Sequence, residues 1–234
     1  MVLIEITDID LISTRTDQEF LERSVETLAE RIRQNIDEYG QAIVGLSGGS
    51  TPKPIYEALG KEEIDWGKVT LFLVDERYVP ADHKDSNQKM IRETLMKSAL
   101  IPDARVVFPD TTRSINDCVD DYEQRLALVL AQGIPHIVTL GMGDDGHIAS
   151  LFPPVGDAAF SDRLVIHTQT ENFAVRDRIS TTMVVIGSAE RKIFFLKGAE
   201  KKKVWETMEH SFDITRWPAV AALNLGGGVV ISRW

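Results

Sequence analysis

The sequence predicts an α/β fold in which one doubly wound, mainly parallel sheet carries helices on both faces. Short apolar runs alternate along the chain with segments of helical periodicity. The apolar runs are continuous, which is typical of strands buried on both faces of a parallel sheet. The 234 residues contain no evident linker or repeat, so we expect a single Rossmann-like domain over residues 1–234.

The helices are predicted from apolar residues spaced three or four positions apart. The first carries Leu21, Val25 and Leu28, with Asp17 as its expected N-cap and Gly40 as its end. A second begins at Pro52, a residue suited to a first helical turn. Further helices are expected after a cap at Ser86 and at 115–130, 199–209 and 218–223.

Six apolar runs predict the strands, at 42–46, 69–74, 136–140, 182–186, 192–196 and 229–234. The stretch from Pro153 to Asp177 is the least regular of the chain. We expect it to form loops or a small extra layer.

Composition and charge exclude several classes of function. The formal net charge is −10, which disfavours nucleic acid and anionic membranes as partners because both demand a basic surface. Cys118 is the single cysteine, so no internal disulfide forms. The start, MVLIEITDID, has no basic region typical of a signal peptide, and no apolar run approaches the roughly 20 residues that span a bilayer. We expect a cytoplasmic protein that is a monomer or a small homo-oligomer.

Three of the predicted strands end in unusual polar sequences. AIVGL is followed by SGGSTP, VTLFLV by DERYVPADHKDSN, and HIVTL by GMGDDGHIAS. Ligands of open parallel sheets bind beyond the carboxyl ends of the strands, so these segments are candidates for one site.

The SGGSTP segment, Ser47–Pro52, has the composition of an anion cradle. Its glycines let backbone N–H groups approach an oxyanion, and the following helix adds a positive N-terminal dipole. It is neither a Walker A loop nor a dinucleotide-binding fingerprint. The alternative is a glycine turn in which Ser50 or Thr51 caps the helix.

The other segments supply cations and histidines. Arg77 of the DER triplet suits a bidentate grip on phosphate or carboxylate, although such a cluster is more often a solvated ion pair. Arg178 and Lys201 are further candidates for the local positive field that an acidic chain needs to bind an anion. His147 and His83 compete as the catalytic imidazole. No metal site is evident apart from a weak magnesium motif at Asp144 and Asp145.

Taken in order, SGGSTP, DERYV with DHKDSN, GMGDDGHIASLFP and RISTT resemble the 6-phosphogluconolactonase family over roughly residues 15 to 210. The wider superfamily includes glucosamine-6-phosphate deaminase. The resemblance implies hydrolysis of 6-phospho-D-glucono-1,5-lactone to 6-phosphogluconate in the cytosolic pentose phosphate pathway, with no cofactor and a small phosphorylated sugar lactone as the partner.

The resemblance also implies site residues. His147 is the implied general base, with Asp145 as its neighbour. The implied substrate- and phosphate-binding residues are Ser47, Gly48, Gly49, Ser50, Thr51, Arg77, Arg178 and Lys201. The tail after Lys203 matches the family only loosely, so no site residue is transferred from it.

The implied chemistry suits these residues. One imidazole can take a proton from water and return it to the leaving ring oxygen, while backbone N–H groups of a glycine turn face the developing oxyanion. Two rivals remain. A deaminase is disfavoured because this chain has DER and A-S-L-F-P where that subfamily has DEY and A-F-N-E-P. A silent sugar-phosphate sensor is disfavoured because no DNA-binding module is visible.

Overall fold

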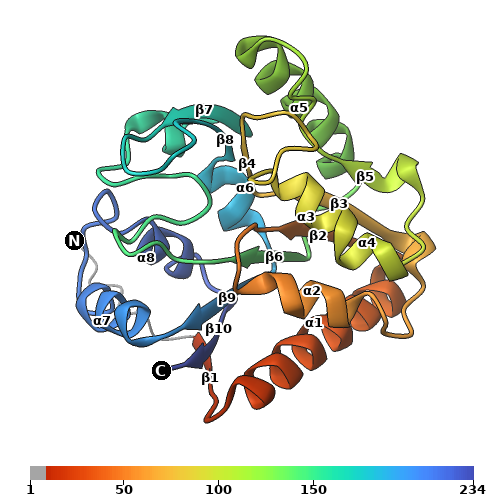
Figure 1. Cartoon of the computed structure of the whole chain (residues 1–234), viewed down its shortest axis with the longest axis horizontal. Coiled ribbons are helices and arrows are strands. Elements are labelled where there is room, and N and C mark those ends of the chain that lie inside the picture. The colour runs from red at the N-terminus through yellow and green to blue at the C-terminus, as the bar shows by residue number, and fades with distance from the viewer. Residues whose placement is uncertain (1–8) are drawn as a thin grey trace.

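The computed structural model describes residues 9–234, and within them seven parallel strands form one sheet in the order β1–β10–β9–β6–β2–β3–β5 (Figure 1). The strands of this sheet are β1 (Ile9–Ser13), β2 (Ala42–Leu46), β3 (Val69–Leu73), β5 (Val106–Val107), β6 (Ile137–Leu140), β9 (Arg191–Lys197) and β10 (Gly228–Arg233). The predicted mainly parallel α/β architecture is confirmed.

Helices cover both faces of the sheet. They are α1 (Asp17–Tyr39), α2 (Pro52–Leu59), α3 (Asn87–Glu93), α4 (Leu95–Ser98), α5 (Ile115–Leu130), α6 (Met183–Ser188), α7 (Ala199–Met208) and α8 (Pro218–Leu223). Successive residues of β2 enter opposite cores, because side chains alternate along a strand. Ile43 packs with the core that includes α5, α6 and α8, and Val44 with the core that includes α1, α2 and α4. Within residues 9–234 we find no helix of the length and apolarity that crossing a membrane requires.

The first helix begins one residue earlier than its predicted cap implies. Thr16 has extended backbone angles, and its hydroxyl accepts a hydrogen bond from the Glu19 N–H at 3.0 Å. The expectation that Asp17 is the cap is therefore wrong. Asp17 is the first helical residue, where its charge faces the helix dipole. Gly40 ends the helix with a φ of +74°, as predicted.

The predicted strand at 182–186 is also wrong, because this segment forms helix α6. Met183, Val185 and Ile186 are buried, whereas Val184 is 40% exposed, so the segment buries one face. A short run of β-branched residues does not distinguish a strand from a buried helical turn.

A second sheet, of three antiparallel strands, lies beside the first. Its order is β4 (Asp75–Arg77), β8 (Asp177–Thr181) and β7 (Val165–Gln169). Two of these strands lie within or next to the stretch for which a small extra layer was one expectation. The sheet joins the main one through Val74, whose carbonyl accepts from the Thr181 N–H at 2.8 Å.

The strand order reverses between β2 and β6. The chain runs from β2 through β3 to β5 on one side, then returns to β6 on the other side of β2 and continues outward to β9 and β10. The carboxyl ends of β2 and β6 therefore diverge at a topological switch point, where open α/β sheets bind their ligands.

Candidate active site

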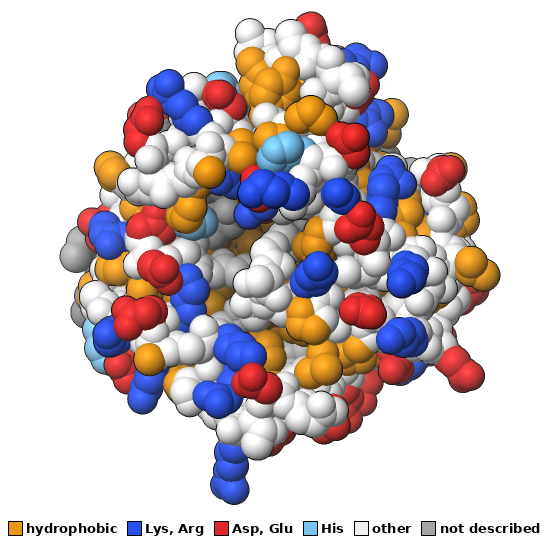
Figure 2. Space-filling view, in the orientation of Figure 1, with side chains coloured by type: hydrophobic (Ala, Val, Ile, Leu, Met, Phe, Trp, Pro, Cys, Tyr) orange, Lys and Arg blue, Asp and Glu red, His pale blue; other side chains and the backbone are white. Residues whose placement is uncertain are grey.

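A cavity of about 410 Å³ opens at this switch point. It is lined by residues 47–52, Asp75, Arg77, residues 141–144, His147, Ala149, Phe173, Arg178, Phe195, Lys197 and Lys201. Figure 2 shows a hollow near the centre of this face with Lys and Arg side chains around it. The three unusual segments of the sequence thus meet in one place.

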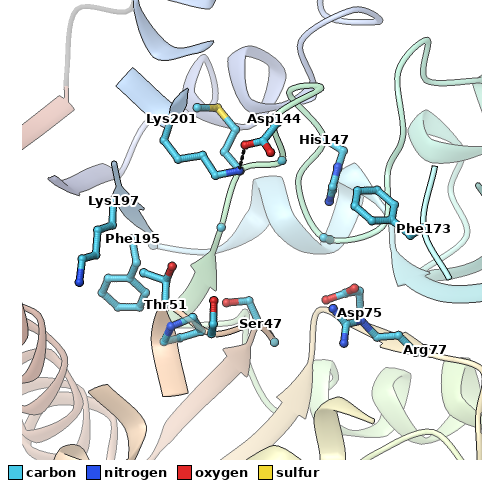
Figure 3. Close-up of a pocket in the computed structure, with 18 of the residues that line it drawn as sticks. Ser47, Thr51, Asp75, Arg77, Asp144, His147, Phe173, Phe195, Lys197 and Lys201 are labelled. Atoms are coloured by element: carbon cyan, nitrogen blue, oxygen red, sulfur yellow. Dashed lines mark hydrogen bonds and ion pairs between the residues drawn. The ribbon is translucent and has the colours of Figure 1, made fainter. Parts of the chain in front are cut away.

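The loop after β2 is fixed by a buried cluster of hydroxyl groups. The Ser47 N–H donates to Thr139 Oγ1 at 2.9 Å, and the Tyr56 hydroxyl donates to the Ser47 carbonyl at 3.1 Å. Gly49 has a φ of +109°, a conformation that side chains with a Cβ avoid. The Thr51 side chain makes no capping hydrogen bond to α2, so the interpretation of Thr51 as a helix cap is not supported. The loop instead borders the cavity at the start of α2 (Figure 3).

His147 is held by Asp145, two residues earlier in the turn after β6. The ring Nδ1 of His147 lies 2.6 Å from Asp145 Oδ1, and the backbone N–H of His147 donates to the same oxygen at 3.2 Å. Burial by itself would raise the pKa of Asp145, but the hydrogen bonds from His147 outweigh this and keep that pKa below its ordinary value. An ionised Asp145 fixes the proton on Nδ1, which leaves Nε2 as the acceptor. The imidazole borders the cavity (Figure 3).

The turn that carries these two residues requires a glycine at position 143. The Gly143 N–H donates to the His147 carbonyl at 2.8 Å, which closes the turn. A Cβ built on Gly143 would overlap both His147 Nδ1 and the Asp145 carboxylate. A Cβ on Gly141, in the same cavity wall, would meet nothing within 4 Å.

We therefore expect Gly143→Ala to displace the imidazole and Gly141→Ala to leave it in place. A misplacement of about 1 Å costs on the order of 10²-fold in rate, and kcat should fall by about that factor in Gly143→Ala alone. Measuring kcat of both variants tests this difference, with melting temperatures to show that both remain folded. Equal activity in both would contradict the close contact described here.

Arg77 and Arg178 face each other as direct cross-strand partners of β4 and β8. Like charges in this arrangement repel each other, and an anion bound between them would relieve that repulsion. Burial, and next the charge of Arg77, lowers the pKa of Arg178. Within residues 9–234 neither guanidinium forms an ion pair, and their hydrogen bonds go to the Asp85 and Val175 carbonyls. Among the described residues no carboxylate lies within ion-pair distance of either guanidinium, although the charges of Asp75, Glu76 and Asp85 partly offset the repulsion at Arg178.

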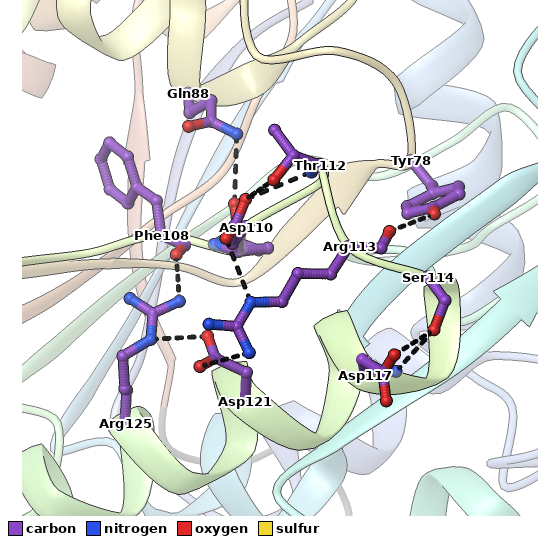
Figure 4. Close-up of polar contacts among 11 residues, drawn as sticks. Tyr78, Gln88, Phe108, Asp110, Thr112, Arg113, Ser114, Asp117, Asp121 and Arg125 are labelled. Carbon is purple, nitrogen blue, oxygen red and sulfur yellow. Dashed lines mark hydrogen bonds and ion pairs between the residues drawn. The ribbon is translucent and has the colours of Figure 1, made fainter.

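A second cavity, beside α5, shows the contrasting arrangement. Two of its three arginines are already neutralised, since Arg113 pairs with Asp110 at 3.1 Å and with Asp121 at 3.3 Å, and Arg125 pairs with Asp121 at 2.8 Å (Figure 4). The third, Arg92, lies over the Phe108 ring. This network fastens the loop that precedes α5 to the helix. Arg77 and Arg178, in contrast, line the same cavity as His147 and donate only to backbone carbonyls, which suits them to an anionic ligand there.

Lys201 reaches the cavity from α7. Its Nζ lies 2.6 Å from Asp144 Oδ1 (Figure 3). The two neighbouring acids of the turn therefore have different partners, since Asp144 pairs with Lys201 and Asp145 with His147. Asp75 is buried in the wall near the arginines and accepts a hydrogen bond from Ser150 Oγ at 2.7 Å. Ala149, which lies between His147 and Ser150 in the sequence, has a φ of +48°. Such a positive φ is strained for a residue with a Cβ and is of the kind found at functional sites.

Glu76 organises the segment behind Arg77. Its carboxylate is fully buried and accepts hydrogen bonds from the N–H groups of Arg77, Asn87 and Gln88, each at 2.7 Å. These contacts tie β4 to the start of α3. Burial raises the pKa of Glu76 to about 7, although the backbone hydrogen bonds oppose the shift.

This raised pKa predicts a dependence of stability on pH. A carboxyl group whose pKa is higher in the folded state stabilises the fold below its unfolded pKa and loses that contribution as pH rises through the folded value. The free energy of unfolding of the wild type relative to Glu76→Gln should therefore decrease between about pH 4.5 and pH 7, by up to roughly 3 kcal/mol. Urea denaturation of both proteins at several pH values measures this difference, and a constant or growing difference would contradict the shift.

The C-terminal segment also contacts the His147 turn. Arg216 donates through Nη1 to the Asp145 carbonyl at 2.6 Å and lies 3.8 Å over the Trp217 ring. Trp217 packs so close to Gly146 that a Cβ there would overlap its ring. The family resemblance implied no site residue in this region, and a Trp before the Pro that starts α8 does not by itself indicate a contact with the His147 turn.

The structure brings nearly all the sequence-predicted site residues together. His147 and the eight predicted binding residues line the cavity, and Asp145 lies behind His147. His83, the rival imidazole, does not line it, and its Nδ1 accepts from the Asp85 N–H at 3.2 Å. Asp75, Phe173 and Lys197 line the cavity without having been singled out. Within residues 9–234, no group of three or more His, Cys, Asp or Glu side chains is arranged to hold a metal ion.

Comparison with known proteins decides the family. The model of the glucosamine-6-phosphate isomerase/6-phosphogluconolactonase family matches residues 15–231. The chain belongs to this family. Within it, the chain is 41% identical over 223 residues to the probable 6-phosphogluconolactonase of Dictyostelium discoideum, covering 92% of this chain and 94% of that protein. It is 35% identical over 209 residues to the Synechocystis 6-phosphogluconolactonase, covering 86% of each.

Solved structures of the family share the fold. The 6-phosphogluconolactonase of Thermotoga maritima superposes with a TM-score of 0.84 at 28% identity, covering 96% of this chain and 99% of that one. The Plasmodium vivax 6-phosphogluconolactonase gives a TM-score of 0.88 at 27% identity, covering 100% of this chain and 92% of that one. These relatives and structures carry the lactonase name, in agreement with the subfamily that DER and A-S-L-F-P indicate.

Proposed function

We propose that this protein hydrolyses 6-phospho-D-glucono-1,5-lactone to 6-phospho-D-gluconate, and that His147 is the general base. The observation that carries the proposal is the hydrogen-bonded Asp145–His147 pair in a cavity that also holds two arginines with no carboxylate in ion-pair contact among residues 9–234. The pair suits water activation, and the arginines suit a phosphate group.

The substrate is bound through its phosphate. Arg77 and Arg178 provide charge-assisted hydrogen bonds, which are the strong ones available to an anion. Lys201 and the N–H and hydroxyl groups of residues 47–51 supply further donors in the same cavity. Because the whole chain is acidic, these groups account for the affinity for a dianionic phosphate.

Hydrolysis then follows from one imidazole. His147 Nε2 takes a proton from a water molecule as the water oxygen bonds to the lactone carbonyl carbon, and the carbonyl electron pair moves to its oxygen. N–H and hydroxyl donors of the cavity wall stabilise this oxyanion. The Gly143 and Gly146 N–H groups are not among them, because they donate to the His147 and Gly143 carbonyls. When the tetrahedral intermediate collapses, the bond from the carbonyl carbon to the ring oxygen breaks, and the imidazolium returns its proton to that oxygen. Asp145 stabilises the imidazolium in between.

The scheme needs neither a cofactor nor a covalent nucleophile, because a lactone is an activated ester. The substrate is a soluble phosphorylated sugar, so we place the enzyme in the cytoplasm, where the pentose phosphate pathway operates.

An assay of two substrates tests the proposal. The protein should accelerate the opening of freshly generated 6-phosphogluconolactone above its spontaneous rate and release no ammonia from glucosamine 6-phosphate. Ammonia release without lactone opening would assign the chain to the deaminase branch of the family instead.

A further inference from the structure

Phe173 is a partly exposed aromatic residue at the cavity. It lies on the loop between β7 and β8, it is 43% exposed, and its ring borders the cavity beside His147 (Figure 3). Because it belongs to neither hydrophobic core, burial explains only part of the reason for a large ring at this position.

The ring contacts both polar groups on which the proposed reaction depends. It meets the His147 imidazole edge to face, with ring centroids 5.4 Å apart and an interplanar angle of 78°. Its centroid lies 5.7 Å from the guanidinium carbon of Arg178. Both distances fall within the ranges of favourable aromatic and cation–π contacts.

Phe152 completes the arrangement from the other side. Its ring lies 4.8 Å from His147, 5.9 Å from Phe173 and 5.9 Å from the Arg178 guanidinium carbon. The hydrogen bond from Nδ1 to Asp145 restrains the imidazole from one side. The two aromatic rings pack against the same imidazole and add to that restraint, which helps to direct Nε2.

Arg178 also holds the loop that carries Phe173. Its Nε donates to the Val175 carbonyl at 2.9 Å, and the Thr170 N–H donates to the Arg176 carbonyl at 3.1 Å across the base of the loop. One guanidinium therefore touches the loop twice, through its Nε and through the Phe173 ring.

We propose that Phe173 is a positioning residue that couples the phosphate-binding guanidinium of Arg178 to the orientation of the His147 imidazole. The inference rests on the proposed function. Phe173 does not touch the reacting atoms in this scheme. It restricts the base and the phosphate-binding cation at the same time, so phosphate binding and a correctly oriented imidazole occur together.

Substitutions at position 173 that remove the aromatic ring, with or without keeping a large apolar side chain, test this role. Phe173→Ala and Phe173→Leu should lower kcat roughly tenfold on both 6-phosphogluconolactone and unphosphorylated gluconolactone, because His147 loses its edge-to-face contact. The KM should rise for the phosphorylated lactone alone, because only that substrate uses Arg178. Phe173→Tyr, which keeps the ring, should restore both constants.

Phe160→Ala is the matched control. Phe160 is 37% exposed and does not line the cavity, so this variant should keep wild-type kinetics. The melting temperatures of Phe173→Ala and Phe160→Ala should change equally little. Wild-type kinetics in Phe173→Ala, full activity in Phe173→Leu, or a large loss of stability in Phe173→Ala alone would each overturn the inference. A wild type that fails to open the lactone would instead refute the proposed function, so the two failures are distinguishable.

Discussion

His147→Ala is expected to lose about 10²–10⁴-fold in turnover of 6-phosphogluconolactone, the contribution of a positioned general base. The variant should keep its melting temperature, because the imidazole belongs to the cavity wall and not to either hydrophobic core. It should also keep its affinity for 6-phosphogluconate, because the phosphate is held by other residues. Initial rates corrected for spontaneous lactone opening, together with calorimetric binding of the product, measure both effects.

Two further variants sharpen this prediction. Asp145→Asn should lose less than His147→Ala, because the amide still reaches Nδ1 but no longer stabilises the imidazolium. His83→Ala should match the wild type, because His83 lies outside the cavity. Near-normal turnover in folded His147→Ala would show that the base is elsewhere.

Arg178→Ala should lower kcat/KM about 10- to 150-fold for the phosphorylated lactone, the equivalent of one charge-assisted hydrogen bond of roughly 1.5–3 kcal/mol. The loss on unphosphorylated gluconolactone should be much smaller. The reason is the arrangement of Arg77 and Arg178, two cations facing each other without a described carboxylate partner. Such a pair gains most from a dianion and little from a neutral sugar.

Arg176→Ala is the control for this measurement. Arg176 lies two residues away, is 57% exposed and already pairs with Glu171 at 3.1 Å. Its loss should leave both substrates unaffected, because exposed ion pairs contribute little. Equal losses on the two lactones in Arg178→Ala would contradict a role in phosphate binding.

Strands β2, β3, β6, β9 and β10 of the main sheet were predictable from sequence, because strands buried on both faces read as unbroken apolar runs. Strand β1 was not predicted, because it is largely exposed and lacks such a run. The smaller sheet was not predictable in this way. Strand β8 buries Arg178, Ser180 and Thr181, and their hydrogen bonds come from segments far away in the chain, such as the Val74 carbonyl that accepts from Thr181 Oγ1 at 2.9 Å. Neither hydropathy nor periodicity contains that information.

The same reasoning applies to the site. Ser47, Arg77 and His147 could be proposed because each follows a predicted strand at the edge where ligands bind. Phe173 and Arg216 could not, because each reaches the His147 turn from a separate segment, and only the folded chain brings them within contact distance.

A single turnover in ¹⁸O-labelled water, with the protein in excess over 6-phosphogluconolactone, tests the central claim most directly. Attack of water activated by His147 on the lactone carbonyl predicts one ¹⁸O in the carboxylate of 6-phosphogluconate, none in the C5 hydroxyl, and an unchanged protein mass. Unlabelled carboxylate with ¹⁸O in the protein, or label at C5, would contradict the account, because the new bond would then have formed through a protein carboxylate or at the sugar carbon.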